Sequence, residues 1–156
     1  MEHALIIVKP DGVQRKLIGK IISRLEEKGF VIMGLKMTFI SEELASSLYA
    51  VHKGKDFHNQ LIKYMTSSPV VGIGLKGINA VNVARKLIGA TFGQDAEPGT
   101  IRGDYAISKR FNLIHCSDSQ ETADREIRLF FKNEELLDYD TTDLHWIYDT
   151  SMAKYV

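Results

Sequence analysis

Residues Asn112 to Ser119 place one histidine, His115, after a short apolar run and before a polar turn that opens a helix. An imidazole can attack phosphorus at neutral pH because one ring nitrogen is unprotonated, provided that an acceptor holds the N–H of the other. The segment therefore predicts a nucleophile that handles phosphate. Position alone leaves an alternative open, because a histidine between a strand and a helix is more often a hydrogen-bonded structural residue.

Glu126 flanks the apolar stripe of the helix that follows, so it is expected to face back toward Ser117. A carboxylate there would stabilise the cationic imidazole and, through Ser117, orient the ring of His115. The alternative is an ordinary surface glutamate. The backbone carbonyl of Cys116 is a second candidate acceptor for the ring nitrogen that does not attack, and its thiol is expected to fill core space.

The positive charge that phosphoryl transfer needs can come from Lys9, Arg85 and Arg102, which lie at element ends or in a loop. Taken singly, each is more often a solvated surface cation. Tyr49 and Phe57 lie near each other in the sequence and offer an aromatic face for a nucleobase, with core packing as the alternative.

Two other motifs carry no site. The stretch Gly72 to Gly77 lacks the spacing and the terminal Ser or Thr of a P-loop, so it indicates a strand. The other histidines show no spacing of paired metal ligands, so no metal site made of protein side chains is predicted; they are His3, His52, His58 and His145.

Composition predicts a single domain over residues 1–156, because 44% of the residues are hydrophobic and 26% are charged. Twenty basic residues balance twenty acidic ones, so no nucleic-acid partner is expected. No apolar stretch approaches the length of a membrane span, so no membrane association is expected either. The single cysteine excludes an internal disulfide, and a cytoplasmic location is expected.

Hydrophobic periodicity predicts the elements. Strands are expected at 5–8, at 31–39 with one covered face that carries all of its odd-numbered apolar residues, at 71–75 and from 113. A helix of about four turns is expected over 13–25, two short helices over 42–49 and 57–65, one between Asn79 and Gly89, and one capped by Asp118. Residues 91–111 are expected to form a long irregular loop.

The order strand, helix, strand, strand, helix, strand matches a split βαβ layout. The predicted fold class is therefore α+β and ferredoxin-like, with a four-stranded antiparallel sheet covered by helices.

Four motifs, in their order and spacing, resemble the nucleoside diphosphate kinase family from Ala4 to about Tyr148. These motifs are Val8 to Arg15, Tyr64 to Val71, Pro98 to Asp104 and Asn112 to Ser119. The resemblance implies a ping-pong phosphotransferase in which His115 takes the terminal phosphoryl group of a nucleoside triphosphate and passes it to a nucleoside diphosphate.

The resemblance also implies roles for the other candidates. Ser117 and Glu126 would orient His115, and Tyr49 would lie beside it. Phe57 would stack on the base, which accounts for broad nucleotide acceptance. The phosphate and sugar contacts would come from Lys9, Arg85, Thr91, Arg102 and Asn112, with Lys9 and Asn112 reaching the sugar hydroxyls.

The resemblance further implies Mg²⁺ that enters on the nucleotide phosphates, and a homo-oligomer, with a hexamer built from dimers as the expected form. Two residues depart from the family pattern. Cys116 follows the histidine where glycine or alanine is usual, and Gly93 replaces a proline that many members have in the loop that resembles the family's trimer contact. The alternative function is a catalytically weak nucleotide-binding or scaffold protein of the same fold.

Overall fold

The computed structural model describes residues 1–149, and its centre is a four-stranded sheet in the order β2-β3-β1-β4. The strands are β1 (Glu2–Val8), β2 (Val31–Thr38), β3 (Val70–Gly77) and β4 (Ile114–Cys116). Every neighbouring pair runs antiparallel. The predicted α+β fold with a four-stranded antiparallel sheet is confirmed.

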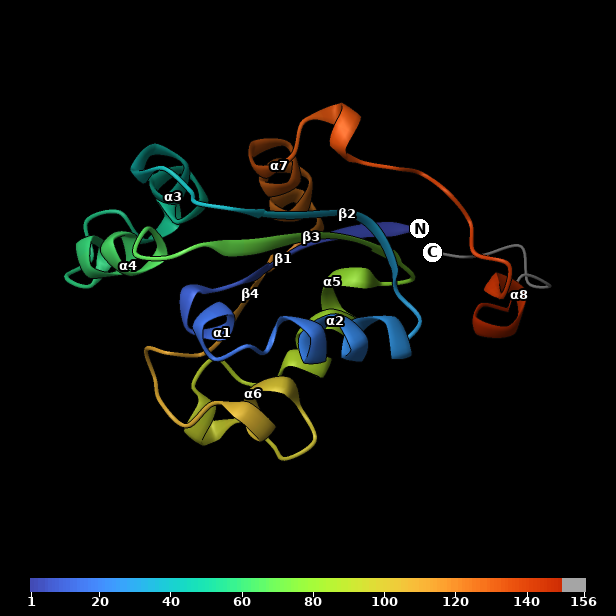
Figure 1. The fold of residues 1–156 in the computed structure, drawn as a ribbon, viewed down its shortest axis with the longest axis horizontal. Helices are drawn as coiled ribbons and strands as arrows, with labels where there is room; N and C mark the ends of the chain where they lie inside the picture. Colours follow the sequence, from blue (N-terminus) through green and yellow to red (C-terminus); the bar gives the residue numbers. More distant parts are fainter. Residues whose placement is uncertain (150–156) are drawn as a thin grey trace.

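Helices cover both faces of this sheet (Figure 1). On one side lie α1 (Pro10–Gln14), α2 (Ile18–Glu27), α5 (Ala80–Ile88) and α6 (Ile101–Tyr105), and on the other lie α3 (Glu42–Leu48), α4 (His58–Met65) and α7 (Gln120–Phe130). The remaining elements are the short helices η1 (Ala50–His52), η2 (Gly93–Asp95), η3 (Asn133–Glu135) and α8 (Leu144–Ile147).

Strand β1 is buried on both faces and joins the two hydrophobic cores. Ala4, Ile6 and Val8 pack with α2 and α5, whereas Leu5 and Ile7 pack with α3, α4 and α7. Because side chains alternate across a strand, a continuous apolar run is what a strand covered on both sides requires. The position of β1 at the centre also lets it carry β4 on its other edge.

The single helix predicted over 13–25 is wrong, because the chain turns between α1 and α2. Lys16 adopts a left-handed conformation with φ of 58°. The N–H of Leu17 donates to the carbonyl of Gly12 and that of Lys16 to the carbonyl of Val13, the pattern of a Schellman cap. Helix ends of this kind usually carry glycine at the left-handed position, and here the residue is a lysine. The apolar spacing continues across the turn, so the sequence did not indicate that the helix ends there.

The covered face predicted for the odd-numbered residues of 31–39 is confirmed for Val31 and Met33, which are buried, and is wrong for the residues that follow. A bulge between Ile32 and Gly34 shifts the register, so residues before and after it alternate to different faces. Leu35, Met37 and Phe39 consequently remain exposed, at 55%, 58% and 67%, on an edge strand.

Helix caps match the sequence only in part. Ser41 caps α3, and Gly89 ends α5 with φ of 92°. Asn79 precedes α5 but makes no side-chain cap, and Ser119 in place of Asp118 caps α7 by accepting from the N–H of Thr122. The loop predicted over 91–111 contains η2 and α6. None of the helices in residues 1–149 has the length and apolar character needed to cross a membrane.

Gly72 of β3 provides a test of the packing between the sheet and α7. A methyl group at this position would overlap the ring of Phe130, which is 4% exposed and has no room to move. We expect Gly72→Ala to lower the free energy of unfolding by about 1–3 kcal/mol, measured by chemical denaturation. Gly19→Ala is the matched control, because nothing lies within 4 Å of the added atom in α2. An equal loss in both variants would contradict this packing.

Candidate active site

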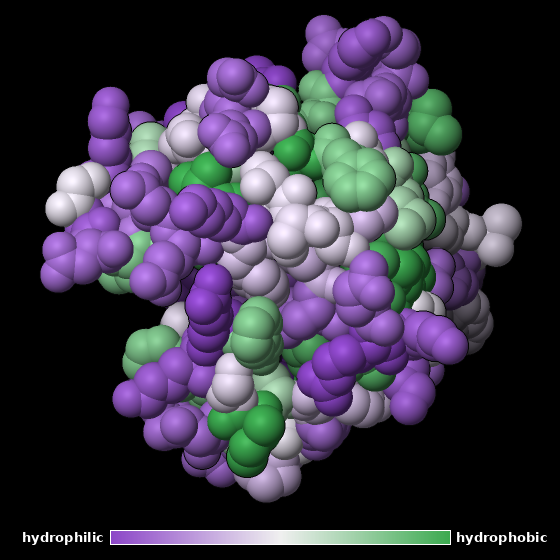
Figure 2. All heavy atoms as spheres, turned by 60° about the vertical axis from the view of Figure 1, so that its left-hand side comes forward, coloured by the Kyte–Doolittle hydropathy of each residue, from purple (hydrophilic) through white to green (hydrophobic). Residues whose placement is uncertain are grey.

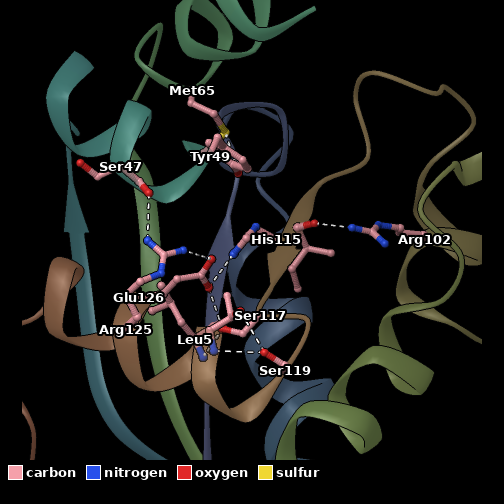
Figure 3. Close-up of polar contacts among 12 residues, drawn as sticks. Leu5, Ser47, Tyr49, Met65, Arg102, His115, Ser117, Ser119, Arg125 and Glu126 are labelled. Carbon is pink, nitrogen blue, oxygen red and sulfur yellow. Dashed lines mark hydrogen bonds and ion pairs between the residues drawn. The ribbon is translucent and has the colours of Figure 1, made fainter. Parts of the chain in front are cut away.

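His115 lies on β4, opposite Ile7 of β1, and its ring is held by a carboxylate of α7. Nε2 of His115 lies 3.0 Å from Oε2 of Glu126, a side chain that is 2% exposed (Figure 3). A carboxylate only accepts, so Nε2 carries the proton and Nδ1 keeps its lone pair. In the described part of the chain no hydrogen bond engages Nδ1. The Nδ1 lone pair of the ring is therefore left available.

Ser117 supports the same carboxylate from below. Its Oγ donates to Oε2 of Glu126 at 2.7 Å and accepts from the N–H of Leu5 at 3.2 Å. The side chain is fully buried, so both bonds form away from water. The predicted group of His115, Ser117 and Glu126 therefore comes together, with Ser117 linking the carboxylate to the central strand.

Cys116 differs from its predicted role as a carbonyl partner of the histidine, because Glu126 takes that place. The thiol side chain is 9% exposed and lines the cavity beside His115. Burial raises the pKa of the Cys116 thiol to about 12. A protonated thiol is a weak nucleophile, so its expected role as core filler agrees with the structure.

A strained turn presents the start of β4. Leu113 has φ of 69°, and the N–H of Ile114 donates to the carbonyl of Asn112 at 2.8 Å, which closes a γ-turn of the rare positive-φ type. Asp11 holds this turn, because its Oδ2 accepts from the N–H of Leu113 at 3.1 Å and its Oδ1 accepts from the hydroxyl of Tyr64. Backbone strain maintained in this way is characteristic of functional sites.

Lys9 follows β1 and reaches the same turn from the other side. Its Nζ donates to Oδ1 of Asn112 at 2.7 Å, and the residue is 8% exposed. Burial, and then the nearby charge of Arg102, lower the pKa of Lys9 to about 8. Among residues 1–149 no carboxylate pairs with this Nζ, and a buried amine in such a place is suited to an anion that arrives from outside.

Arg102 of α6 is tied to the main chain. Its guanidinium donates to the carbonyls of Asn112 at 3.1 Å and Ile114 at 2.6 Å, and Nη1 reaches the carbonyls of Gly89 and Ala90. Burial lowers the pKa of Arg102, although a guanidinium stays charged at neutral pH. The arginine therefore fixes the loops around the site and keeps a positive charge there.

These side chains line one cavity of about 430 Å³. Of the predicted site residues it brings together Lys9, Tyr49, Arg85, Thr91, Arg102, Asn112, His115 and Glu126, with Ser117 directly beneath. Figure 2 shows a face of the molecule that is hollowed at its left between two lobes.

Phe57, like Ser117, is a predicted site residue that does not line the cavity. It precedes α4, is 48% exposed, and its ring lies 5.3 Å from that of His52, which does line the cavity. Tyr49 lies beside His115 as predicted, with the two rings edge-on at 5.5 Å between centroids. Its hydroxyl contacts Sδ of Met65 at 3.6 Å.

The structure adds residues that the sequence argument missed. Asp118 in the turn before α7, and Thr122 and Arg125 of α7, line the cavity along with His52. The position of Asp118 within the predicted nucleophile segment, Asn112 to Ser119, was a usable signal. No sequence signal distinguished Arg125 from the other charged residues of the helix.

Comparisons with known proteins identify the family of this chain. The family model described as nucleoside diphosphate kinase matches residues 2–136. The chain belongs to the nucleoside diphosphate kinase family. It is 53% identical over 149 residues to the nucleoside diphosphate kinase of Carboxydothermus hydrogenoformans, covering 96% of this chain and 100% of the relative. It is 47% identical to that of Archaeoglobus fulgidus, covering 96% and 99%.

Solved structures of the family share the fold. The halophilic nucleoside diphosphate kinase of Halobacterium salinarum, solved in complex with CDP, superposes with a TM-score of 0.92 at 48% identity, covering 94% of this chain and 98% of that one. A family protein of Babesia bovis gives 0.92 at 38% identity, covering 95% and 100%. The family shows this chain to be an enzyme that transfers phosphoryl groups between nucleotides.

The lowered pKa of Lys9 leads to a test of nucleotide binding at pH 8. At pH 8 the Lys9 amine is neutral in about half of the molecules. A bound phosphate would stabilise its protonated form, so binding should take up about half a proton per site. Calorimetric titration with a nucleoside diphosphate in two buffers of different ionisation enthalpy measures this uptake. Lys9→Arg, which stays charged, should lose it; equal uptake in both proteins would contradict the assignment.

Proposed function

We propose that His115 carries the phosphoryl group between two nucleotides in a ping-pong reaction. The observation that supports it is the bond from Nε2 of His115 to Glu126, which leaves the Nδ1 lone pair available beside a cavity lined by Lys9, Arg85 and Arg102. Nδ1 forms a bond to the terminal phosphorus, the bond from that phosphorus to the bridging oxygen breaks, and the diphosphate leaves with the electron pair. A terminal phosphate oxygen of a second nucleoside diphosphate then bonds to this phosphorus as the N–P bond breaks, and the electron pair returns to Nδ1.

The cations would hold the transferring group. Lys9, Arg85 and Arg102 would bind phosphate oxygens with Thr91, and Asn112 with Lys9 would reach the sugar hydroxyls. Phe57, whose ring contacts that of the cavity-lining His52, would stack on the base without reading its edges, which suits many bases. The structure of a relative with CDP supports a nucleoside diphosphate as ligand.

We propose Mg²⁺ as the cofactor, bound through the nucleotide. Asp118 and Glu126 are the carboxylates that line the cavity, and Glu126 is engaged by His115 and Ser117. No group of three metal-binding side chains occurs among residues 1–149. The donor set therefore fits a metal held by phosphate oxygens, with Asp118 nearby; such a metal would neutralise phosphate charge.

Substitution of the nucleophile gives the direct test of the reaction. Incubation with γ-labelled nucleoside triphosphate should leave acid-labile, base-stable label on the wild-type protein, and His115→Ala should lose the label and the transfer. His145→Ala is the matched control, since His145 lies on α8 outside the cavity. Label retained in His115→Ala would refute the nucleophile. Nucleotide binding without any transfer by the wild-type protein would favour the scaffold alternative instead.

We also propose that the protein is a homo-oligomer, a hexamer built from dimers, that acts in the cytoplasm. The edge of β2 supports association, because Leu35, Met37 and Phe39 expose apolar surface on a strand that ends the sheet. An exposed apolar edge of this kind is typical of an interface. The single cysteine is compatible with a reducing compartment.

Light scattering after size exclusion tests the assembly. The wild-type protein should have the mass of six chains, and Met37→Asp should shift it to a smaller assembly because a carboxylate would be buried in the interface. Leu129→Asp, at a 41% exposed apolar position of α7, is the control and should keep the wild-type mass. A wild-type mass of one chain, or no change in Met37→Asp, would contradict the proposal.

A further inference from the structure

Arg125 connects two parts of the molecule that are far apart in the sequence. Its Nη1 donates to the carbonyl of Ser47 at 3.0 Å, and its Nη2 lies 3.8 Å from Oε1 of Glu126. Figure 3 shows the guanidinium between α3 and the carboxylate that holds His115. The same side chain lines the cavity.

The contact at Ser47 is placed where a cation is favoured. Ser47 is the next-to-last residue of α3, and the last carbonyls of a helix have no partner within it and carry partial negative charge. Two residues later the chain reaches Tyr49, whose ring lies against His115. The hydrogen bond from Arg125 to the carbonyl of Ser47 therefore holds the start of the segment that carries Tyr49 and, further on, Phe57.

The contact at Glu126 uses the oxygen that the nucleophile leaves available. Oε2 of Glu126 binds His115 and Ser117, whereas Oε1 faces Arg125. The Arg125 side chain is 47% exposed, and an ion pair at such a position contributes little to stability by itself. The arrangement instead provides a geometric link between α3 and the Glu126 carboxylate of α7.

We propose that Arg125 is a positioning residue that sets residues 42–65 relative to the Glu126–His115 pair. This inference rests on the proposed function, because residues 42–65 carry the side chains expected to meet the nucleoside. Residue 125 would affect the rate of His115 phosphorylation by a donor whose base and sugar bind this segment, because the segment then positions the reacting phosphorus. It would not matter for a donor that is only a phosphoryl group.

The test compares two donors for the phosphorylation of His115 in single-turnover experiments. With ATP, Arg125→Met should slow the reaction by about tenfold, the scale of one charge-assisted hydrogen bond. With phosphoramidate the Nδ1–P bond forms as the P–N bond breaks and ammonia leaves. Because that donor has no nucleoside, the rate should stay within about twofold of wild type.

Arg128→Met is the matched control, since Arg128 is an exposed cation of the same helix and does not line the cavity. It should match wild type with both donors, and Arg125→Lys should recover part of the lost ATP rate. An equal loss with both donors would show that residue 125 acts on the nucleophile or the fold alone, and no loss would show that it is idle; either overturns the inference. Absence of phosphorylation in the wild-type protein would instead overturn the proposed function.

Discussion

The contact between Nε2 of His115 and the buried carboxylate of Glu126 is the interaction on which the site depends. It decides which ring nitrogen keeps its lone pair, and so which atom would attack phosphorus in the reaction that we propose. The contact exists because β4 pairs with the edge of β1 and α7 packs on the face of β1 that carries Leu5 and Ile7. Ser117 adds a hydrogen bond to the backbone of Leu5. A strand buried on both faces thus holds the reactive group with little freedom.

The remainder of the site is arranged at a cost to the fold. Lys9 is a buried amine with a lowered pKa, the buried guanidinium of Arg102 donates to main-chain carbonyls, and Leu113 occupies a strained turn. Each feature is unfavourable alone and is maintained by neighbours, such as Asp11 on the turn. Together they leave a cavity with positive charge that a bound anion would neutralise. This explains how a chain with no net charge can hold a phosphate site.

Much of this arrangement could be predicted from the sequence. The nucleophile segment, the flanking position of Glu126 on its helix, and Lys9 after a central strand all follow from local periodicity. The left-handed Lys16, the bulge in β2 and the turn at Leu113 could not be predicted. These residue types show no preference for such conformations, and the turn at Leu113 is held by Asp11, which is distant in the sequence. The link through Arg125 was also hidden, since its partner at Ser47 is distant in the sequence.

The site of phosphate attachment tests the account most directly. In protein labelled with ¹⁵N at histidine, NMR of the free enzyme should show the His115 ring protonated at Nε2. After reaction with a nucleoside triphosphate, the phosphorus should couple to Nδ1. Phosphate found on Nε2, or a free ring protonated at Nδ1 alone, would contradict the role assigned to Glu126.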